Sequence, residues 1–178
     1  YENLRGFVQT VAEGGCTHFI VHARKAILQG LSPKENREIP PLKYDYVYRL
    51  KQDFPDLEII INGGITTLED IDEHLRHVDG VMVGREAYQN PYFLAAIDSR
   101  YFGMDDDAPD RQQVVQEILP YIDREMEKGV PLKSITRHML GLFQGRPGAK
   151  AWRRHISENA HLKGATPDIL TEAAAKVR

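Results

Sequence analysis

Three short apolar runs with no polar alternation constrain the fold of this chain more than any other feature. They are Phe19-Ile20-Val21, Ile59-Ile60-Ile61 and Val81-Met82-Val83. Runs of this kind are typical of strands that are buried on both faces of a parallel sheet. Apolar residues at helical spacing precede and separate them, at residues 4–11, 44–54 and 67–75. This alternation of helix and strand predicts a parallel α/β sheet.

Each run is followed by residues suited to ligand binding. These residues are His22 after the first run, Asn62, Gly63 and Gly64 after the second, and Gly84 and Arg85 after the third. In an α/β barrel the carboxyl ends of the strands form the reactive face, and the last two strand–loop units commonly bind phosphate. Glycine amides would meet the phosphate oxygens, and Arg85 would add charge-assisted hydrogen bonds. The alternative is that the glycines only form tight turns and that His22 is structural.

The chain is too short for a whole barrel. A TIM barrel needs eight strands and about 250 residues, whereas these 178 residues begin with Tyr1 and show three apolar runs. We therefore expect a piece of a longer protein. Residues 1–103 would form the C-terminal part of a TIM (β/α)8 barrel, and residues 104–178 an all-α helical bundle domain. Within the latter, helices are expected at residues 111–128, 134–144, 149–158 and 167–177.

Charge is distributed unevenly along the chain. The net charge is -3, yet residues 128–157 contain no Asp or Glu. The basic residues there are Lys128, Lys133, Arg137, Arg146, Lys150, Arg153 and Arg154. A basic face on an acidic protein indicates a polyanionic partner, although a solvated helix face is the simpler interpretation. Helical spacing places Trp152 and Ile156 toward the core instead.

Several classes of protein are disfavoured by composition. The single cysteine, Cys16, excludes an internal disulfide and a Cys-based zinc cluster. Cys16 precedes its strand and has no evident base partner, so we expect an inert thiol. The histidines have no carboxylate or cysteine at ligand spacing, so no metal site is assigned. No run reaches the ~18 apolar residues of a membrane span, and no signal peptide is apparent.

Four elements occur together in one order, at residues 22–26, 29–42, 62–65 and 84–91. With the helical tail they resemble the C-terminal half of the A subfamily of bacterial tRNA-dihydrouridine synthases, over essentially the whole chain. The resemblance implies a cytoplasmic flavoenzyme that uses FMN and NADPH to reduce uridine to dihydrouridine in the D-loop of tRNA. The subfamily points to positions 20 and 20a.

The resemblance also implies roles for individual residues. Those implied to hold FMN are His22, Asn62, Gly63, Gly64, Gly84 and Arg85. Those implied to touch tRNA are Lys34, Arg37, Lys150 and Arg153. The family's proton-donating cysteine is expected upstream of Tyr1, so no catalytic residue is assigned here. We therefore expect the chain alone to be catalytically silent and to bind FMN poorly, with no membrane and no obligate protein partner.

Two other hypotheses remain open from the sequence. A non-catalytic RNA-binding module on a degenerate half-barrel would account for the basic segment. A flavin-free barrel that acts on sugar phosphates would account for the glycine sites but leaves the basic residues unexplained. Flavin absorbance in the intact protein separates the first hypothesis from the enzyme, and salt-dependent tRNA binding tests the RNA-binding role.

Overall fold

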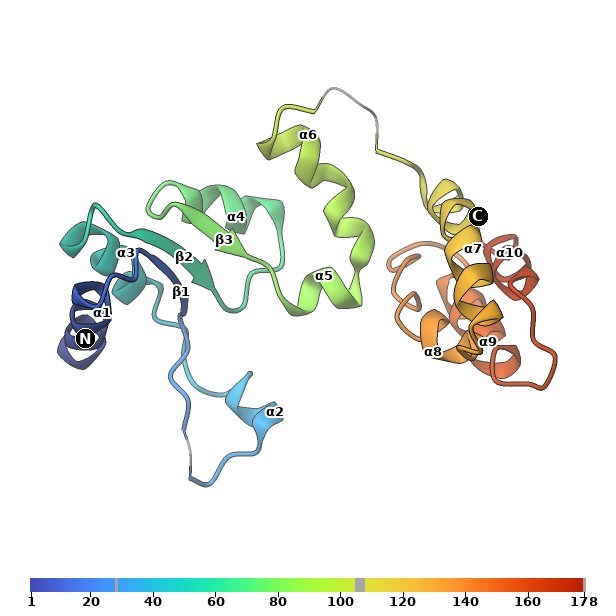
Figure 1. Ribbon diagram of the computed structural model, residues 1–178, viewed down its shortest axis with the longest axis horizontal. Coiled ribbons are helices and arrows are strands. Elements are labelled where there is room, and N and C mark those ends of the chain that lie inside the picture. The colour runs from blue at the N-terminus through green and yellow to red at the C-terminus, as the bar shows by residue number, and fades with distance from the viewer. Residues whose placement is uncertain (28, 105–107, 178) are drawn as a thin grey trace. The chain divides into compact units, whose positions relative to one another are not determined.

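A computed structural model describes residues 1–27, 29–104 and 108–177. The chain divides into two compact units, Tyr1–Gly84 and Arg85–Arg178 (Figure 1). Each unit buries its own set of apolar side chains. The domain boundary expected between residues 103 and 104 stays a prediction, and residues 105–107 next to it lie outside the described residues.

The first unit has the expected alternation of helix and strand. Its elements are α1 (Glu2–Glu13), β1 (His18–His22), α2 (Pro33–Asn36), α3 (Tyr44–Asp53), β2 (Glu58–Asn62), α4 (Leu68–Leu75) and β3 (Gly80–Met82). The strands form one parallel sheet in the order β1-β2-β3. Each of the three apolar runs therefore lies in a strand as predicted, except that Val83 follows the end of β3.

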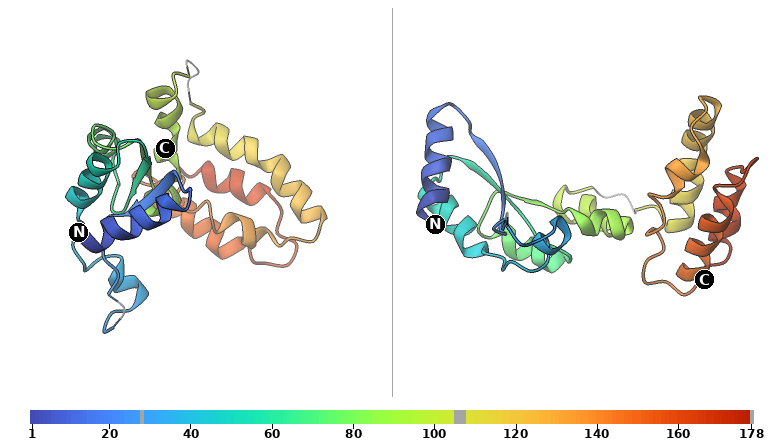
Figure 2. Two further views of the ribbon diagram at one scale, coloured as in Figure 1. Left: turned by 60° about the vertical axis from the view of Figure 1, so that its left-hand side comes forward. Right: turned by 90° about the horizontal axis from the view of Figure 1, so that it is seen from below.

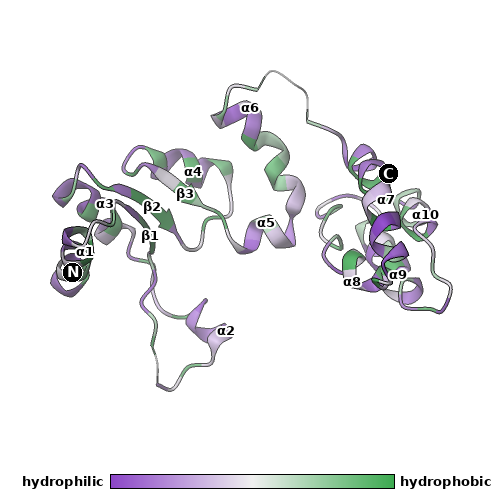
Figure 3. Ribbon diagram, in the orientation of Figure 1, coloured by the Kyte–Doolittle hydropathy of each residue, from purple (hydrophilic) through white to green (hydrophobic). Residues whose placement is uncertain are grey.

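The two faces of this sheet differ in burial. Phe19, Ile59 and Ile61 are buried on the face where α3 packs on β2 and α4 on β3 (Figure 2). On the other face Ile20 is 55% exposed and Met82 is 38% exposed, although hydrophobic residues run along β1 and β2 (Figure 3). The expectation of burial on both faces is wrong for this unit, because Ile20 and Met82 on the face opposite α3 and α4 are exposed.

Hydrogen bonds hold the connection between β1 and α3 in place. It contains α2, whose first turn is capped by Ser32 in a reciprocal pair with Glu35. The Asn36 side chain also bonds both the amide and the carbonyl of Ile27, at 2.7 and 2.8 Å. The Arg24 guanidinium donates to the carbonyls of Glu38 and Pro40. Arg24 therefore stabilises the connection between β1 and α3 through these hydrogen bonds, and it also adds a positive charge there.

The regular elements in the described residues of the second unit are all helices. Its elements are α5 (Arg85–Gln89), the 3-10 helix η1 (Pro91–Ala96), α6 (Ile97–Tyr101), α7 (Arg111–Glu127), α8 (Leu132–Thr136), α9 (Ala149–Asn159) and α10 (Asp168–Ala174). Trp152 and Ile156 of α9 lie in its core, as predicted, together with Leu170 of α10. The Trp152 indole donates to the carbonyl of Met139 at 3.3 Å.

The helix expected over residues 134–144 is wrong. Helix α8 ends at Thr136, and turns continue from there to Gly148. These turns bury Met139, Leu142 and Phe143 together. They also bring Gly141 so close to the backbone of Gln89 that a Cβ at residue 141 would lie 2.0 Å from the Gln89 carbonyl oxygen. The close contact of Gly141 with the Gln89 backbone therefore determines the conformation of this segment, and the helical spacing of its apolar residues does not.

Candidate functional site

The carboxyl ends of the strands align at one edge of the sheet. His22 pairs with Asn62, and Asn62 with Met82, so the three side chains share the sheet face that also carries Ile20. The Asn62 amide donates to the Met82 sulfur at 3.2 Å. A Cβ built on Gly63 would lie 3.1 Å from Cε1 of His22. The structure thus brings His22 and the Asn62–Gly63 segment together, and it adds Met82, which the sequence analysis did not assign.

The glycine pair after β2 is required by the fold itself. Gly63 has φ of 120° and Gly64 has φ of 72°, a region that residues with a Cβ rarely adopt. A Cβ on Gly64 would also lie 2.5 Å from the Leu42 side chain and 3.1 Å from the Tyr44 hydroxyl oxygen. The tight-turn explanation is therefore correct for this pair, and it leaves room for ligand binding by the same backbone.

An aromatic cluster of Tyr44, Tyr48 and His74 lies beside this glycine pair, which it contacts through Tyr44. The Tyr44 ring contacts the His74 ring edge-on, with centroids 4.4 Å apart, and the Tyr48 hydroxyl lies 2.7 Å from His74 Nδ1. Burial raises the pKa of the Tyr44 phenol and lowers the pKa of the His74 imidazole. Neither tyrosine was predicted from the sequence to be part of the site, although their spacing of four residues on α3 is typical of a shared helix face.

Gly84 differs from the other two glycines. Its φ is not positive, and no atom lies within 4 Å of where its Cβ would stand. Neither conformation nor packing therefore requires glycine at this position in the first unit. Close approach of a ligand to the backbone is a further physical reason for glycine here. Arg85 begins α5 in the second unit, so its placement relative to Gly64 is not described.

The turn that leads into α4 is held by a carboxylate. Asp70 accepts from the amides of Thr66 and Thr67, at 3.1 and 3.0 Å. Burial alone would raise the pKa of Asp70, but these hydrogen bonds outweigh it and the pKa is lowered. Asp70 is therefore held as an anion against the amides of the two residues that precede α4.

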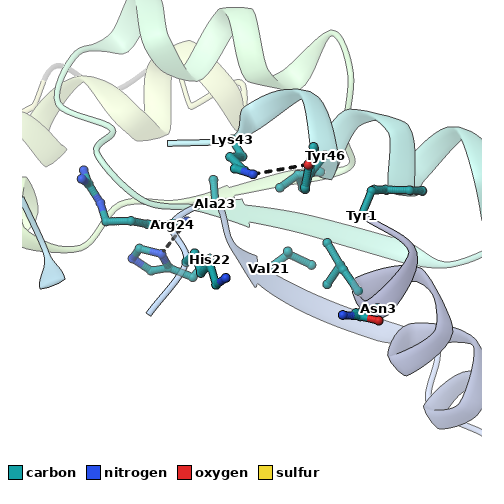
Figure 4. A pocket seen from close by; sticks show the side chains of 11 residues that line it. Tyr1, Asn3, Val21, His22, Ala23, Arg24, Lys43 and Tyr46 are labelled. Carbon is teal, nitrogen blue, oxygen red and sulfur yellow. Dashed lines mark hydrogen bonds between the residues drawn. The ribbon is translucent and has the colours of Figure 1, made fainter. Parts of the chain in front are cut away.

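His22 also lines a cavity of about 380 Å³ beside β1, drawn in Figure 4. The described residues that line it include Arg24, Lys25 and Lys43 and no Asp or Glu. The backbone amide of Arg24 donates to Nδ1 of His22 at 3.1 Å. Nδ1 is thus an acceptor without a proton, and Nε2 carries the proton of the ring as a hydrogen-bond donor.

The residues implied to touch tRNA fall into two exposed pairs. Lys34 lies on α2 and Arg37 follows its end, whereas Lys150 and Arg153 lie on α9 three residues apart. The first pair belongs to the first unit and the second pair to the second. Each pair is thus accessible, while the distance between the pairs is not described. Cys16, as predicted, precedes β1, and its half-buried thiol donates to the His18 carbonyl at 3.3 Å.

No described helix is long and apolar enough to span a membrane. Within the same residues, no cluster of three or more His, Cys, Asp or Glu side chains is arranged to hold a metal ion.

Comparison of the sequence with known proteins identifies the family of this chain. The family model for dihydrouridine synthase (Dus) matches residues 1–177, so the chain belongs to the dihydrouridine synthase family. It is 58% identical over 178 residues to a protein of Vibrio cholerae serotype O1 named tRNA-dihydrouridine(20/20a) synthase, covering 99% of this chain and 54% of that protein. Proteins of the same name from Shewanella oneidensis and Escherichia coli K12 are 58% and 60% identical over 178 and 174 residues. Those matches cover 100% and 97% of this chain, and 53% and 50% of the relatives, so the chain spans about half the length of the curated relatives it matches.

Proposed function

We propose that this chain is the C-terminal part of a flavin-dependent tRNA-dihydrouridine synthase, a cytoplasmic enzyme that reduces uridine to dihydrouridine with NADPH. Positions 20 and 20a of tRNA are the proposed targets, since the relatives' names contain them. The observation that supports this most is the alignment of His22 with Asn62, next to Gly63, in a chain of this family. The three strands would then be the last strands of a TIM barrel, and the second unit would supply a helical bundle.

FMN is the proposed cofactor, and the open space at Gly84 fits it because a phosphate or ring can approach the backbone there. Amides of the Asn62–Gly64 segment and of Gly84 would hold the phosphate, with Arg85 supplying positive charge. The Nε2–H group of His22 would donate a hydrogen bond to an acceptor atom of the cofactor. Bound FMN supplies hydride transfer to the uracil ring. Cys16 is not a candidate proton donor, because its thiol precedes β1 and already donates to the His18 carbonyl.

Transfer RNA is the proposed substrate of the whole enzyme. Lys34 and Arg37 on one unit, and Lys150 and Arg153 on the other, would contact its phosphates. Such contacts orient the RNA and carry no sequence information of their own, so the uridine itself must be reached as an unstacked base. Exposure of all four side chains is compatible with this role.

The test uses the full-length enzyme that contains this chain. Gly84→Ala should lower FMN occupancy at least tenfold, as measured by flavin absorbance of the purified protein, because the methyl group would stand where the cofactor approaches. Gly6→Ala is the matched control, since no atom lies within 4 Å of its Cβ position in α1 either. A colourless full-length protein that does not bind added FMN would contradict the proposed function.

A further inference from the structure

Met82, the last residue of β3, holds the side chain of Asn62 on the neighbouring strand. The two residues are register partners in the parallel sheet, and the Asn62 amide donates to the Met82 sulfur at 3.2 Å. Met82 is 38% exposed, so core packing alone does not explain a large apolar side chain here. The bond to Asn62 is a second physical reason for methionine at this position.

The bond to Met82 fixes which end of the Asn62 carboxamide faces β3. A thioether sulfur accepts hydrogen bonds and has no proton to donate, so the amide nitrogen lies toward Met82 and the carbonyl oxygen does not. The oxygen, Oδ1, is therefore directed away from Met82. A leucine at residue 82 would remove this preference, because its side chain neither donates nor accepts hydrogen bonds.

The space before Met82 on this face of the sheet is filled by an apolar side chain. Gly80 lies two residues earlier on β3, on the same face as Met82, and pairs with Ile60 of β2. A Cβ built on Gly80 would lie 3.1 Å from Cγ1 of Ile60, so the isoleucine side chain covers the glycine. Met82 and Asn62 therefore lie beyond this contact, at the carboxyl ends of their strands.

His22 and Asn62 offer opposite hydrogen-bonding groups at neighbouring strand ends. The two residues are register partners, and Nδ1 of His22 accepts from the Arg24 amide, which leaves an N–H donor at Nε2. Asn62 offers the acceptor Oδ1. Phosphate oxygens are also acceptors, so Oδ1 suits a hydroxyl or a ring N–H group instead. The Asn62 side chain thus suits a different part of a ligand from the glycine amides that follow it.

We propose that Met82 is a positioning residue that acts through Asn62. By accepting from the Asn62 amide, Met82 holds Oδ1 of Asn62 where it can accept from a hydroxyl or ring N–H group of the ligand. The inference rests on the proposed function, because it takes FMN as the ligand, whose ribityl chain has hydroxyl donors and whose ring has an N–H donor. An amide that is held before binding loses less conformational entropy when the ligand binds.

Two substitutions of Met82 in the full-length enzyme separate this role from packing. Met82→Leu keeps a similar volume but removes the acceptor, so the affinity for FMN should fall about threefold. Met82→Gln supplies a carbonyl acceptor on a side chain of similar length and should restore most of the lost affinity. A packing role predicts the opposite order, with leucine tolerated and glutamine harmful. Quenching of flavin fluorescence measures both affinities, and a glutamine variant that binds no better than the leucine variant would overturn the proposal.

Met104→Leu is the matched control, because Met104 is another exposed methionine, at 51%, and lies in the second unit. It should leave the FMN affinity unchanged. A double-mutant cycle with Asn62→Ala shows whether Met82 acts through Asn62. In the Asn62→Ala background, Met82→Leu should cause no further loss of affinity. A loss of about threefold in that background would mean that Met82 acts without Asn62, contrary to the proposal.

The contact itself can be measured without flavin, by NMR of the FMN-free full-length protein with isotope-labelled asparagine. The side-chain amide signals of Asn62 are assigned by their loss in Asn62→Asp. Met82→Leu should shift these signals and Met104→Leu should not, because only the first substitution removes their acceptor. Unshifted signals in Met82→Leu would show that Met82 does not hold Asn62. A full-length protein that binds no FMN would contradict the proposed function, whereas this spectrum would still decide whether Met82 holds Asn62.

Discussion

The Tyr44 hydroxyl donates a hydrogen bond of 2.8 Å to the carbonyl oxygen of Gly63. The peptide between Gly63 and Gly64 is trans, as are all described peptides, so its N–H points away from its carbonyl oxygen. By holding this oxygen toward α3, Tyr44 turns the Gly64 amide away from that helix. We therefore expect Tyr44 to orient the Gly64 amide of the proposed phosphate loop.

Tyr44→Phe in the full-length enzyme should weaken FMN binding about fivefold, the typical net effect of one hydrogen bond. Titration of apoprotein with FMN, followed by quenching of flavin fluorescence, measures this loss. Tyr48→Phe is the matched control, because its hydroxyl bonds His74 and not the loop. The control should lower stability and leave the FMN affinity unchanged. Equal loss of affinity in both variants would show that the aromatic cluster acts only on stability.

Gly64 and Gly84 should respond differently to the same substitution. Gly64→Ala places a methyl group against Leu42 in a backbone region unfavourable for alanine, so it should lower the free energy of unfolding by about 1–3 kcal/mol. Gly84→Ala meets no atom within 4 Å and should change it by less than ~0.5 kcal/mol. Urea unfolding of the 178-residue chain, followed by circular dichroism, compares them. Comparable destabilisation at both positions would contradict the distinction drawn at Gly84.

The sheet and its aligned strand ends were predictable because both depend on local patterns. Fully apolar runs followed by His22 and by Asn62 indicate parallel strands, and parallel strands end at one edge. The contact of Tyr44 with Gly63 and that of Tyr48 with His74 were not predictable in this way. They join residues 19 and 26 positions apart, and only tertiary packing brings them together.

The sequence was less informative in the second unit for a related reason. Residues 134–144 have helical apolar spacing, yet Gly141 packs against the backbone of Gln89, so the chain turns there instead. The basic segment was singled out by composition, and its role in RNA binding stays a prediction. Composition could not show that the Thr136 hydroxyl is buried without a partner among the described residues, because only the packing of the chain determines this.

The 178-residue chain alone should form no dihydrouridine in tRNA supplied with FMN and NADPH. In the described sheet, Ile20 and Met82 are exposed on the face that carries His22 and Asn62, so a cofactor there would have no opposing wall. Mass spectrometry of nucleosides from treated tRNA measures the product. The full-length enzyme is the positive control, and turnover by the chain alone would contradict the need for further barrel strands.

The buried His74 should make the first unit less stable in mild acid. Burial lowers its pKa below the ordinary 6.5, although Asp70 and Glu73 oppose this shift and His77 adds to it. The unfolded chain therefore takes up a proton near pH 6.5, while the folded chain takes it up only at lower pH. The resulting stability is complete above pH 6.5 and is lost as the pH falls toward the lowered folded value.

His74→Gln keeps a hydrogen-bonding partner for the Tyr48 hydroxyl and removes this titration. The difference in free energy of unfolding between the wild type and this variant should therefore be largest above pH 6.5 and shrink as the pH falls below it. Urea unfolding of the 178-residue chain between pH 5 and 8 measures the difference. His22→Gln, which replaces an exposed histidine, is the control. If the His74→Gln difference does not change with pH, His74 is not held neutral by burial.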